Sequence, residues 1–391
     1  MNTGLKLLAW LIALAWLWKA ITAARGLPRI PNLFDQQYDR APAGSPSVTI
    51  IVPARNEAAD ITATLESLLS QDYPNLQILA VDDRSTDSTG AIIDAFSSKH
   101  PDKLRGLHIT ELPAGWLGKT HAMALAARHT IAIDHPDYLL FTDADVVFHR
   151  EAIRRSLAQA VATQADHFVT FPTPLIKTHG EGMLLGYLQV MGLWATRPWR
   201  ASDPKSLRDS IGIGAFNLFR TPAYQQLEGF DALRMEILED LTIARRVKLA
   251  GLRQYVAVAP GLITLHWASG AAGVVNVMTK NLFAVFRFCT ALVFIFCLWL
   301  IFFCLGPFVF LVFPETRTPA TLTVVSIVAL YALSSRHSRI SPWYVILFPA
   351  GTVLFIYSLI RSVFTTIKDG GVTWRGTFYP LIDLRKNRNP F

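Results

Sequence analysis

Short apolar runs alternate with amphipathic stretches along the chain after residue 47. The runs have the length of strands, and the stretches between them carry apolar residues every three or four positions, as on one face of a helix. The predicted strands cover residues 48–52, 76–81, 107–110, 138–141 and 146–148, and the predicted helices cover 60–70, 88–98 and 121–133, with Asp60 as a candidate N-cap. Strands and helices that alternate at this spacing predict an α/β fold with a doubly wound, mainly parallel sheet.

The alternation becomes less regular after residue 148. We predict further helices over 151–163 and 238–250 and further strands over 168–171 and 211–219. Residues 183–199 are apolar with few charges, which fits either a core helix or a helix at a membrane surface. Residues 271–288 are apolar but contain Lys280 and Arg287, a pattern typical of an interfacial helix that leads into a membrane.

Longer apolar stretches flank this region on both sides. Residues 5–24 contain one charge, Lys19, and are long enough to span a bilayer. A signal peptide is the alternative, with Thr22-Ala23-Ala24 as a possible cleavage site, and we prefer an uncleaved membrane anchor. Near the other end, residues 289–313 and 343–360 are long enough to span, and residues 320–333 form a shorter apolar stretch.

These patterns divide the chain into six predicted regions. They are a transmembrane anchor (1–25), a linker (26–46), an α/β domain (47–270), an interfacial helix (271–288), a transmembrane region of two or three spans (289–366) and a basic tail (367–391).

Composition and charge favour a multi-pass membrane protein. The chain of 391 residues is 51% hydrophobic and 17% charged, which is a low charged fraction for a soluble enzyme. Its net charge of +8 comes largely from residues beside the apolar stretches, among them Arg25, Arg29 and Arg336, so we expect no nucleic-acid partner. The positive-inside rule places the α/β domain in the cytoplasm, at a bacterial-type inner membrane or its equivalent. The cysteines Cys289, Cys297 and Cys304 all fall in one apolar stretch, where we expect them to pack as small apolar residues.

The same rule gives conflicting answers for the C-terminal tail. Three spans after the α/β domain would place the tail outside, whereas its basic residues, such as Arg385 and Arg388, favour the inside. Either residues 320–333 do not cross fully or the tail departs from the rule.

Two carboxylates follow the predicted strand 138–141. Asp143 and Asp145 would share one face if the strand continued regularly. Carboxylates this close repel each other unless a cation compensates, and Mg²⁺ or Mn²⁺, which usually binds together with phosphates, suits oxygen ligands. A turn or helix cap is the alternative explanation of the pair.

Three further acidic stretches accompany this pair. Val52-Pro53-Ala54-Arg55-Asn56-Glu57 ends the first strand, and Val81-Asp82-Asp83-Arg84-Ser85-Thr86-Asp87-Ser88-Thr89 ends the second. Leu238-Glu239-Asp240-Leu241 opens a predicted helix, where the acid pair would also suit the helix dipole alone. Ligands bind at the carboxyl ends of the strands in open α/β sheets, so we expect a nucleotide-diphosphate site there.

Taken together, the four stretches resemble the motifs of family-2 glycosyltransferases with the GT-A fold. The resemblance covers about residues 47–270 and implies a Rossmann-like, mainly parallel sheet between N- and C-terminal transmembrane helices. The flanking apolar segments and Trp374-Arg375-Gly376-Thr377-Phe378-Tyr379 resemble the lipid-directed branch, which includes ceramide glucosyltransferases and hopanoid-associated glycosyltransferases.

The resemblance also implies roles for individual residues. Pro53, Glu57 and Asp83 would hold the nucleoside end of a nucleotide sugar, with Asp82 and Arg55 as additional donor-binding candidates. Asp143 would contact the ribose or the sugar, Asp145 would bind a divalent cation (Mg²⁺ or Mn²⁺), and Asp240 would be the general base. A positioned carboxylate contributes roughly 10²–10⁴-fold to removal of a proton from an acceptor hydroxyl.

Some features depart from the family or fit it less closely. The Q/R-x-x-R-W motif of many members is absent, which leaves the cationic partner of the diphosphate open, with Lys280 as the candidate. Glu239 and Trp267 are further secondary candidates for the site. Lys119 follows Gly115-Trp116-Leu117-Gly118, which is not a P-loop, and is either a phosphate or sugar contact or a solvated residue at a helix start. Gly212 and Gly214 would allow close backbone approach or tight strand packing.

The sequence therefore predicts an inverting glycosyltransferase that moves a sugar from a nucleotide sugar, first of all a UDP-sugar, to a membrane lipid. A polysaccharide synthase or a polyprenyl-phosphate glycosyltransferase is the alternative enzyme. A non-catalytic membrane protein that uses the sheet for nucleotide binding or assembly is the alternative from another class.

Overall fold

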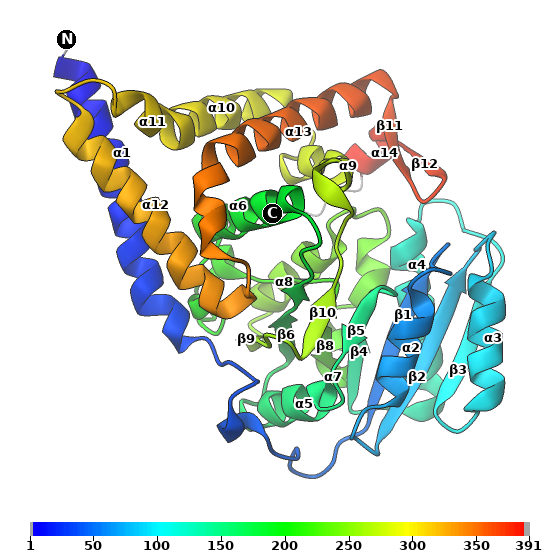
Figure 1. Cartoon of the computed structure of the whole chain (residues 1–391). Helices are drawn as coiled ribbons and strands as arrows, with labels where there is room; N and C mark the ends of the chain where they lie inside the picture. Colours follow the sequence, from blue (N-terminus) through cyan, green and yellow to red (C-terminus); the bar gives the residue numbers. More distant parts are fainter. Residues whose placement is uncertain (1–2, 387–391) are drawn as a thin grey trace. The chain divides into compact units, whose positions relative to one another are not determined.

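The computed structural model describes residues 3–386, so the last residues of the basic tail, including Arg388, lie outside the described part. The chain forms two compact units (Figure 1). A helical unit contains residues 1–30, 176–199 and 267–372, and an α/β unit contains residues 31–175, 200–266 and 373–391.

The α/β unit is built on a sheet of seven strands in the order β3-β2-β1-β4-β8-β6-β9. The strands are β1 (Val48–Ala54), β2 (Leu76–Asp83), β3 (Leu104–Ile109), β4 (Tyr138–Phe141), β6 (His167–Phe171), β8 (Asn217–Arg220) and β9 (Gln254–Val258). All pairs are parallel except those that β8 makes with β4 and β6. The predicted mainly parallel α/β sheet with apolar helices toward both ends of the chain is thereby confirmed.

Helices cover both faces of this sheet. They are α2 (Ile61–Leu69), α3 (Thr89–Lys99), α4 (Gly118–Asp134), α5 (Ala152–Ala162), α7 (Thr221–Gln226) and α8 (Glu239–Leu249). A smaller sheet contains β5 (Val146–Phe148), β10 (Ile263–Leu265) and β7 (Thr173–Pro174), in that order. Asp60 stands at the N-cap of α2 as expected, but its side chain makes no capping hydrogen bond.

The prediction of a strand over residues 211–219 was wrong in its first half. Only Asn217 to Arg220 pair with neighbouring strands, and residues 211–216 form a loop. The loop is fixed by a buried side-chain network. Gln254 bonds both backbone groups of Ile211, at 3.0 Å each, and its amide nitrogen lies 2.8 Å from His167 Nδ1. Burial lowers the pKa of His167 to about 4, so the ring is neutral, and its Nε2 bonds Asn217. Side-chain hydrogen bonds here replace the ladder that the apolar pattern suggested.

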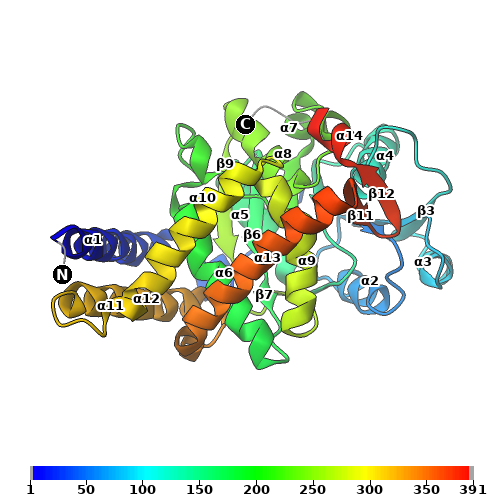
Figure 2. The same cartoon turned by 90° about the horizontal axis from the view of Figure 1, so that it is seen from above.

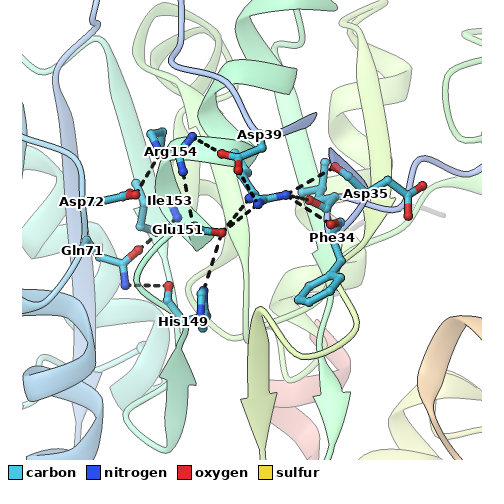
Figure 3. A network of polar contacts seen from close by, with 11 residues as sticks. Phe34, Asp35, Asp39, Gln71, Asp72, His149, Glu151, Ile153 and Arg154 are labelled. Atoms are coloured by element: carbon cyan, nitrogen blue, oxygen red, sulfur yellow. Dashed lines mark hydrogen bonds and ion pairs between the residues drawn. The ribbon is translucent and has the colours of Figure 1, made fainter. Parts of the chain in front are cut away.

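The linker before β1 is held on the α/β unit by ion pairs (Figure 3). Arg154 on α5 contacts Asp39 at 2.7 Å and Asp72 at 3.0 Å. Its neighbour Arg155 contacts Asp39 at 3.0 Å and donates to the carbonyl of Leu33 at 3.0 Å. These contacts fix residues 33–39 against α5.

Within the described residues 3–386, four helices of the helical unit are long and apolar enough to cross a membrane: Thr3–Arg29, Thr290–Phe310, Arg317–Ser338 and Pro342–Lys368. They comprise α1 (Thr3–Gly26), α10 (Thr290–Leu300) with α11 (Gly306–Phe310), α12 (Arg317–Ser338) and α13 (Phe348–Lys368). The apolar stretch at residues 320–333 underestimated the length of this helix, because α12 continues through polar residues at both ends.

Small residues allow close packing between α1 and α12, which lie side by side in Figures 1 and 2. Ala9, Ala13 and Ala20 are buried on α1, and Ala320 and Ser326 on α12. The apolar stretch at 183–199, for which two environments were considered, forms α6 (His179–Ala195) and belongs to this helical unit. The predicted interfacial stretch forms α9 (Gly270–Val285), which packs against α13.

Candidate active site

Three parallel strands deliver their carboxyl ends to one edge of the sheet. The register pairs Ala54 of β1 with Asp82 of β2, and Ile51 of β1 with Phe141 of β4. Strand β8 starts at the same edge, because Asn217 pairs with Phe141 in antiparallel orientation. The acidic stretches that follow these strands are therefore neighbours in space.

Asp143 and Asp145 lie in the turn between β4 and β5, not on one regular strand. The turn is fixed by two hydroxyls. Thr142 donates to the carbonyl of Ala215 at 2.8 Å, and Thr64 on α2 donates to the carbonyl of Ala144 at 2.8 Å. Burial, together with the negative charges of Asp143 and Glu57, raises the pKa of Asp145 to about 7. A carboxyl group under this repulsion gains stability from a nearby cation.

Lys119, in the first turn of α4, lies between two carboxylates. Its Nζ is 2.6 Å from Asp143 Oδ1 and 2.8 Å from Glu239 Oε1. Burial alone would lower the pKa of the ammonium, but the charges of Asp143 and Glu239 raise it well above its usual range. Lys119 therefore remains charged and joins the β4–β5 turn to the start of α8.

Asp240 occupies the first turn of α8, beside this ion pair. Its Oδ1 accepts a hydrogen bond from the Leu241 backbone N–H at 2.7 Å. Burial and the charge of Glu239 raise the pKa of Asp240 to about 7, against the opposing effect of Lys119. A carboxylate with this pKa can accept a proton near neutral pH.

A small pocket opens between these side chains. It is lined by Lys119, Met123, Phe141, Thr142, Asp143, Gly214, Asn217, Phe230, Glu239 and Asp240. The two glycines of the loop before β8 make room for it. A Cβ on Gly214 would lie 2.8 Å from Asp143 Oδ2, and a Cβ on Gly212 would lie 1.8 Å from the carbonyl oxygen of Asp240. Gly212 thus allows close packing of α8 and Gly214 close packing of Asp143, whereas the predicted approach of this backbone to the sugar or acceptor stays a prediction.

A second group of charges lies at the ends of β1 and β2. Arg84 forms a two-point contact with Asp83, with Nε–Oδ1 at 2.8 Å and Nη2–Oδ2 at 3.0 Å. Arg55 Nη1 lies 4.0 Å from Asp83 Oδ2. Asp82 is held differently, because it accepts from the backbone N–H of Ser85 at 3.1 Å and lies 3.2 Å from His108 Nδ1.

Residues from the C-terminal end complete this second group. Arg375 pairs with Glu57 and donates to the carbonyl of Arg55 at 3.1 Å. Arg55 donates to Thr377 Oγ1 at 3.1 Å, and the Gly118 backbone N–H donates to the Tyr379 hydroxyl at 3.2 Å. We gave Arg375 no role from the sequence. The available signal was the stretch Trp374 to Tyr379, which carried a resemblance but no indication of its place in the fold.

The remaining predicted residues lie less close to these groups or outside them. Pro53 is in β1, paired with Val81. Lys280 is on α9 and Trp267 stands just before that helix, so both belong to the helical unit.

The donor set around Asp145 suits a divalent cation that also binds phosphate. Among the described residues 3–386, no three or more His, Cys, Asp or Glu side chains form a group that could hold a metal alone. Mg²⁺ commonly binds through one or two carboxylates and completes its shell with water and substrate phosphates. Asp145, repelled by Asp143 and Glu57, fits that mode.

Comparison with known proteins shows a sequence similarity over part of the chain. The family model described as glycosyl transferase family 2 matches residues 49–213. A 4,4'-diaponeurosporenoate glycosyltransferase of Staphylococcus haemolyticus (strain JCSC1435) is 31% identical over 118 residues. The same-named protein of Staphylococcus aureus (strain bovine RF122 / ET3-1) is 29% identical over 120 residues. These matches cover 30% and 31% of this chain and 29% of each relative, so the chain spans less than a third of the length of the relatives it matches.

Solved structures show only distant similarity. The mannosyltransferase PcManGT from Pyrobaculum calidifontis, in complex with GDP-Man and Mn²⁺, aligns with a TM-score of 0.49 and 17% identity, over 94% of this chain and 88% of that one. TarS 1–349 of S. aureus, in complex with UDP, aligns with a TM-score of 0.41 and 13% identity, over 85% of this chain and 96% of that one.

The sequence match includes most of the candidate site. Three of the four acidic stretches fall within residues 49–213, whereas Glu239 and Asp240 lie beyond the matched region. The sheet that carries these stretches is mainly parallel, as the resemblance to the family implied. Residues 49–213 of the chain are thus similar to glycosyl transferase family 2, and this similarity takes in the ends of β1, β2 and β4.

Proposed function

We propose that the protein transfers a glycosyl unit from a nucleotide sugar, with UDP-sugars as the first candidates, to a lipid acceptor, with inversion at the anomeric carbon. The observation that carries this proposal is the pocket at the start of α8. There Asp240 lies beside the Lys119–Asp143 ion pair at the carboxyl edge of the sheet. The match of residues 49–213 to the model of glycosyl transferase family 2 supports the reaction class.

Asp240 acts as the general base in this proposal. An acceptor hydroxyl entering the pocket donates its proton to the Asp240 carboxylate as its oxygen attacks the anomeric carbon. One displacement of this kind inverts the configuration at that carbon. Lys119 holds Asp143 and Glu239 in place and offsets part of the negative charge around the base.

Residues at the ends of β1 and β2 bind the donor. Asp83 and Glu57 are held by arginines, and Asp82 by a backbone N–H, so their carboxylates have fixed positions before a nucleotide arrives. Asp143 faces the sugar or ribose. Asp145 would hold Mg²⁺ or Mn²⁺, which supplies charge neutralisation for the departing diphosphate.

The apolar helices that precede and follow the catalytic domain in the sequence support the proposal that the acceptor is embedded in the membrane. Four helices have the length and apolarity to span a bilayer. The curated relatives are named for glycosyl transfer to 4,4'-diaponeurosporenoate, a lipid-like acceptor. The basic residues that flank the helices favour a cytoplasmic α/β unit.

The α/β unit also limits the number of crossings. Arg375 pairs with Glu57, so residues before and after the three C-terminal candidate spans lie on the same side of the membrane. An even number of crossings must separate them. We therefore propose that two of these three helices cross fully, which also places the basic tail inside.

The proposal is tested with the full chain purified in lipid nanodiscs. UDP- and GDP-sugars are supplied with a lipid extract, and release of the nucleoside diphosphate and the mass shift of the lipids are measured. We expect turnover that EDTA abolishes and Mn²⁺ or Mg²⁺ restores, and that Asp145→Asn reduces at least tenfold. The surface variant Asp102→Asn is the control, since Asp102 is exposed. Full turnover in EDTA and in Asp145→Asn would contradict the metal assignment, and absence of any donor consumption by the wild type would contradict the function.

A further inference from the structure

The turn between β11 (Gly371–Trp374) and β12 (Thr377–Pro380) has an unusual residue at its tip. Arg375 and Gly376 connect the two strands with φ values of +49° and +76°. A two-residue hairpin turn with positive φ at both positions favours Asn-Gly or Gly-Gly, because a Cβ is strained there. Arginine is disfavoured at the first position, so its side chain is a candidate for a function that offsets the strain.

The contacts on either side of the tip fix where this side chain points. Thr377 accepts a hydrogen bond from Arg55, and Tyr379 accepts one from the Gly118 backbone N–H. Both partners lie at the carboxyl edge of the sheet. The Arg375 guanidinium consequently reaches the end of β1, where it pairs with Glu57 and bonds the carbonyl of Arg55.

Arg375 is the most accessible of the three arginines at this edge. Its side chain is 46% exposed, whereas those of Arg55 and Arg84 are 18% and 17% exposed. Arg84 is engaged with Asp83 through Nε and Nη2. In the pocket, Lys119 is already held by Asp143 and Glu239. A diphosphate that arrives at this edge would meet Arg375 as the cation with the most surface to offer.

The carboxyl edge of the sheet needs an accessible cation to bind a diphosphate. Glu57 lies close enough to Asp143 and Asp145 for their charges to interact, so the region facing a donor is rich in carboxylates. A nucleoside diphosphate is itself multiply negative and would be repelled. A planar guanidinium can bind two phosphate oxygens at once, in a geometry that an ammonium cannot match.

We propose that Arg375 is a donor-binding residue whose guanidinium binds the diphosphate of the nucleotide sugar, with Glu57 holding it in place before the donor arrives. This inference rests on the proposed function. It assigns to the C-terminal hairpin the cation that the chain lacks at the position of the Q/R-x-x-R-W motif. The same guanidinium stabilises the negative charge that gathers on the diphosphate as the glycosidic bond to it breaks.

The test compares nucleotides with one and two phosphates. Binding of UDP, UMP, GDP and GMP to the full chain in nanodiscs is measured in the presence of MnCl₂, for the wild type and for Arg375→Asn. Asparagine suits the left-handed turn position, so this variant keeps the hairpin. We expect the affinity for the preferred nucleoside diphosphate to fall roughly ten- to a hundredfold, the size of one or two lost charge-assisted hydrogen bonds, and the affinity for the monophosphate to change little.

Two further variants sharpen the result. Arg375→Lys keeps the charge but not the planar fork, and we expect an intermediate loss of diphosphate affinity. Arg150→Asn removes an exposed arginine elsewhere on the α/β unit and is the matched control. Equal losses for the diphosphate and the monophosphate in Arg375→Asn would show a structural role only and overturn the inference, as would no loss at all. A wild type that binds neither UDP nor GDP and turns over no donor would instead overturn the proposed function itself.

Discussion

The α/β unit carries two charged clusters at one sheet edge, and they differ in their balance of charge. Around Lys119, one ammonium faces the carboxylates of Asp143 and Glu239, with Asp240 beside them. Around Asp82, Asp83 and Glu57, three guanidinium groups accompany three carboxylates. The first cluster has an excess of negative charge, whereas the charges of the second are balanced.

The difference matches the two halves of a glycosyl transfer. Burial and the charge of Glu239 raise the pKa of Asp240 to about 7, where it can accept a proton. Guanidinium groups suit the anionic end of a donor. In the proposed mechanism the proton acceptor lies at the start of α8, and the anion site lies at the ends of β1 and β2, where arginines offset the carboxylates.

The largest expected effect is loss of the base in the Lys119 cluster. We expect Asp240→Asn to lower the transfer rate roughly 10²–10⁴-fold with little effect on nucleotide binding, because only the proton transfer is lost. The wild-type rate should fall below a pH of about 7, since the pKa of Asp240 lies near that value and the protonated carboxyl cannot act as a base. Transfer rates over pH 5–9 check both expectations. A variant that keeps the wild-type rate and its acid limb would show that another group is the base.

The next effect concerns the single cation of the same cluster. In Lys119→Met, two carboxylates lose their partner, and we expect the rate at neutral pH to fall roughly ten- to a hundredfold. The acid limb of the rate profile should move to higher pH, because Lys119 opposes the rise in the pKa of Asp240. Lys103→Met, on an exposed loop, is the control. An unshifted acid limb would mean that Lys119 does not act on the base.

The two clusters also differ in how far the sequence predicted them. The carboxylates of both follow apolar strands, so their common edge could be predicted from the alternation of strands and helices. Two of their cationic partners, Lys119 and Arg375, could not be predicted in this way. Lys119 had a solvated alternative, because nothing in its surroundings in the chain shows that Asp143 and Glu239 would meet it. Arg375 joins Glu57 across 318 positions, and no local pattern records such a contact.

The membrane helices and the loop before β8 could likewise be predicted only in part from the sequence. Apolar length identified most of the long helices, but the polar ends of α12 concealed its full extent. Residues 211–216 have the apolar character of a strand, yet Gln254 and His167 fix them as a loop through contacts that only the tertiary fold creates. Hydropathy indicates burial, whereas the partner of a buried group depends on the complete fold.

A smaller effect is expected from the glycine that brings α8 to the pocket. In Gly212→Ala, the new Cβ would fall 1.8 Å from the Asp240 carbonyl oxygen, so the first turn of α8 must shift. We expect a loss of about 1–3 kcal/mol in stability, as in overpacked cores, and a lower transfer rate. Thermal inactivation and turnover measure the two. Gly192→Ala is the control, because a Cβ there meets nothing within 4 Å, and equal behaviour of the two variants would contradict the close approach.

The smallest expected effect on the transfer rate belongs to a test of membrane topology. The test concerns Arg375, the third arginine of the cluster. Arg375 can reach Glu57 only if the C-terminal end lies on the same side of the membrane as β1. Single cysteines at Asp102→Cys and Ile382→Cys, in a chain with Cys289, Cys297 and Cys304 replaced by alanine, should react with an impermeant thiol reagent from the same side of sealed vesicles. Both positions are exposed and neither lines the pocket, so transfer should be unchanged. If the cysteine at 382 labels only from the opposite side, the arginine cluster cannot form. In that case an odd number of C-terminal helices crosses, and the donor's diphosphate must find its cation elsewhere in the chain.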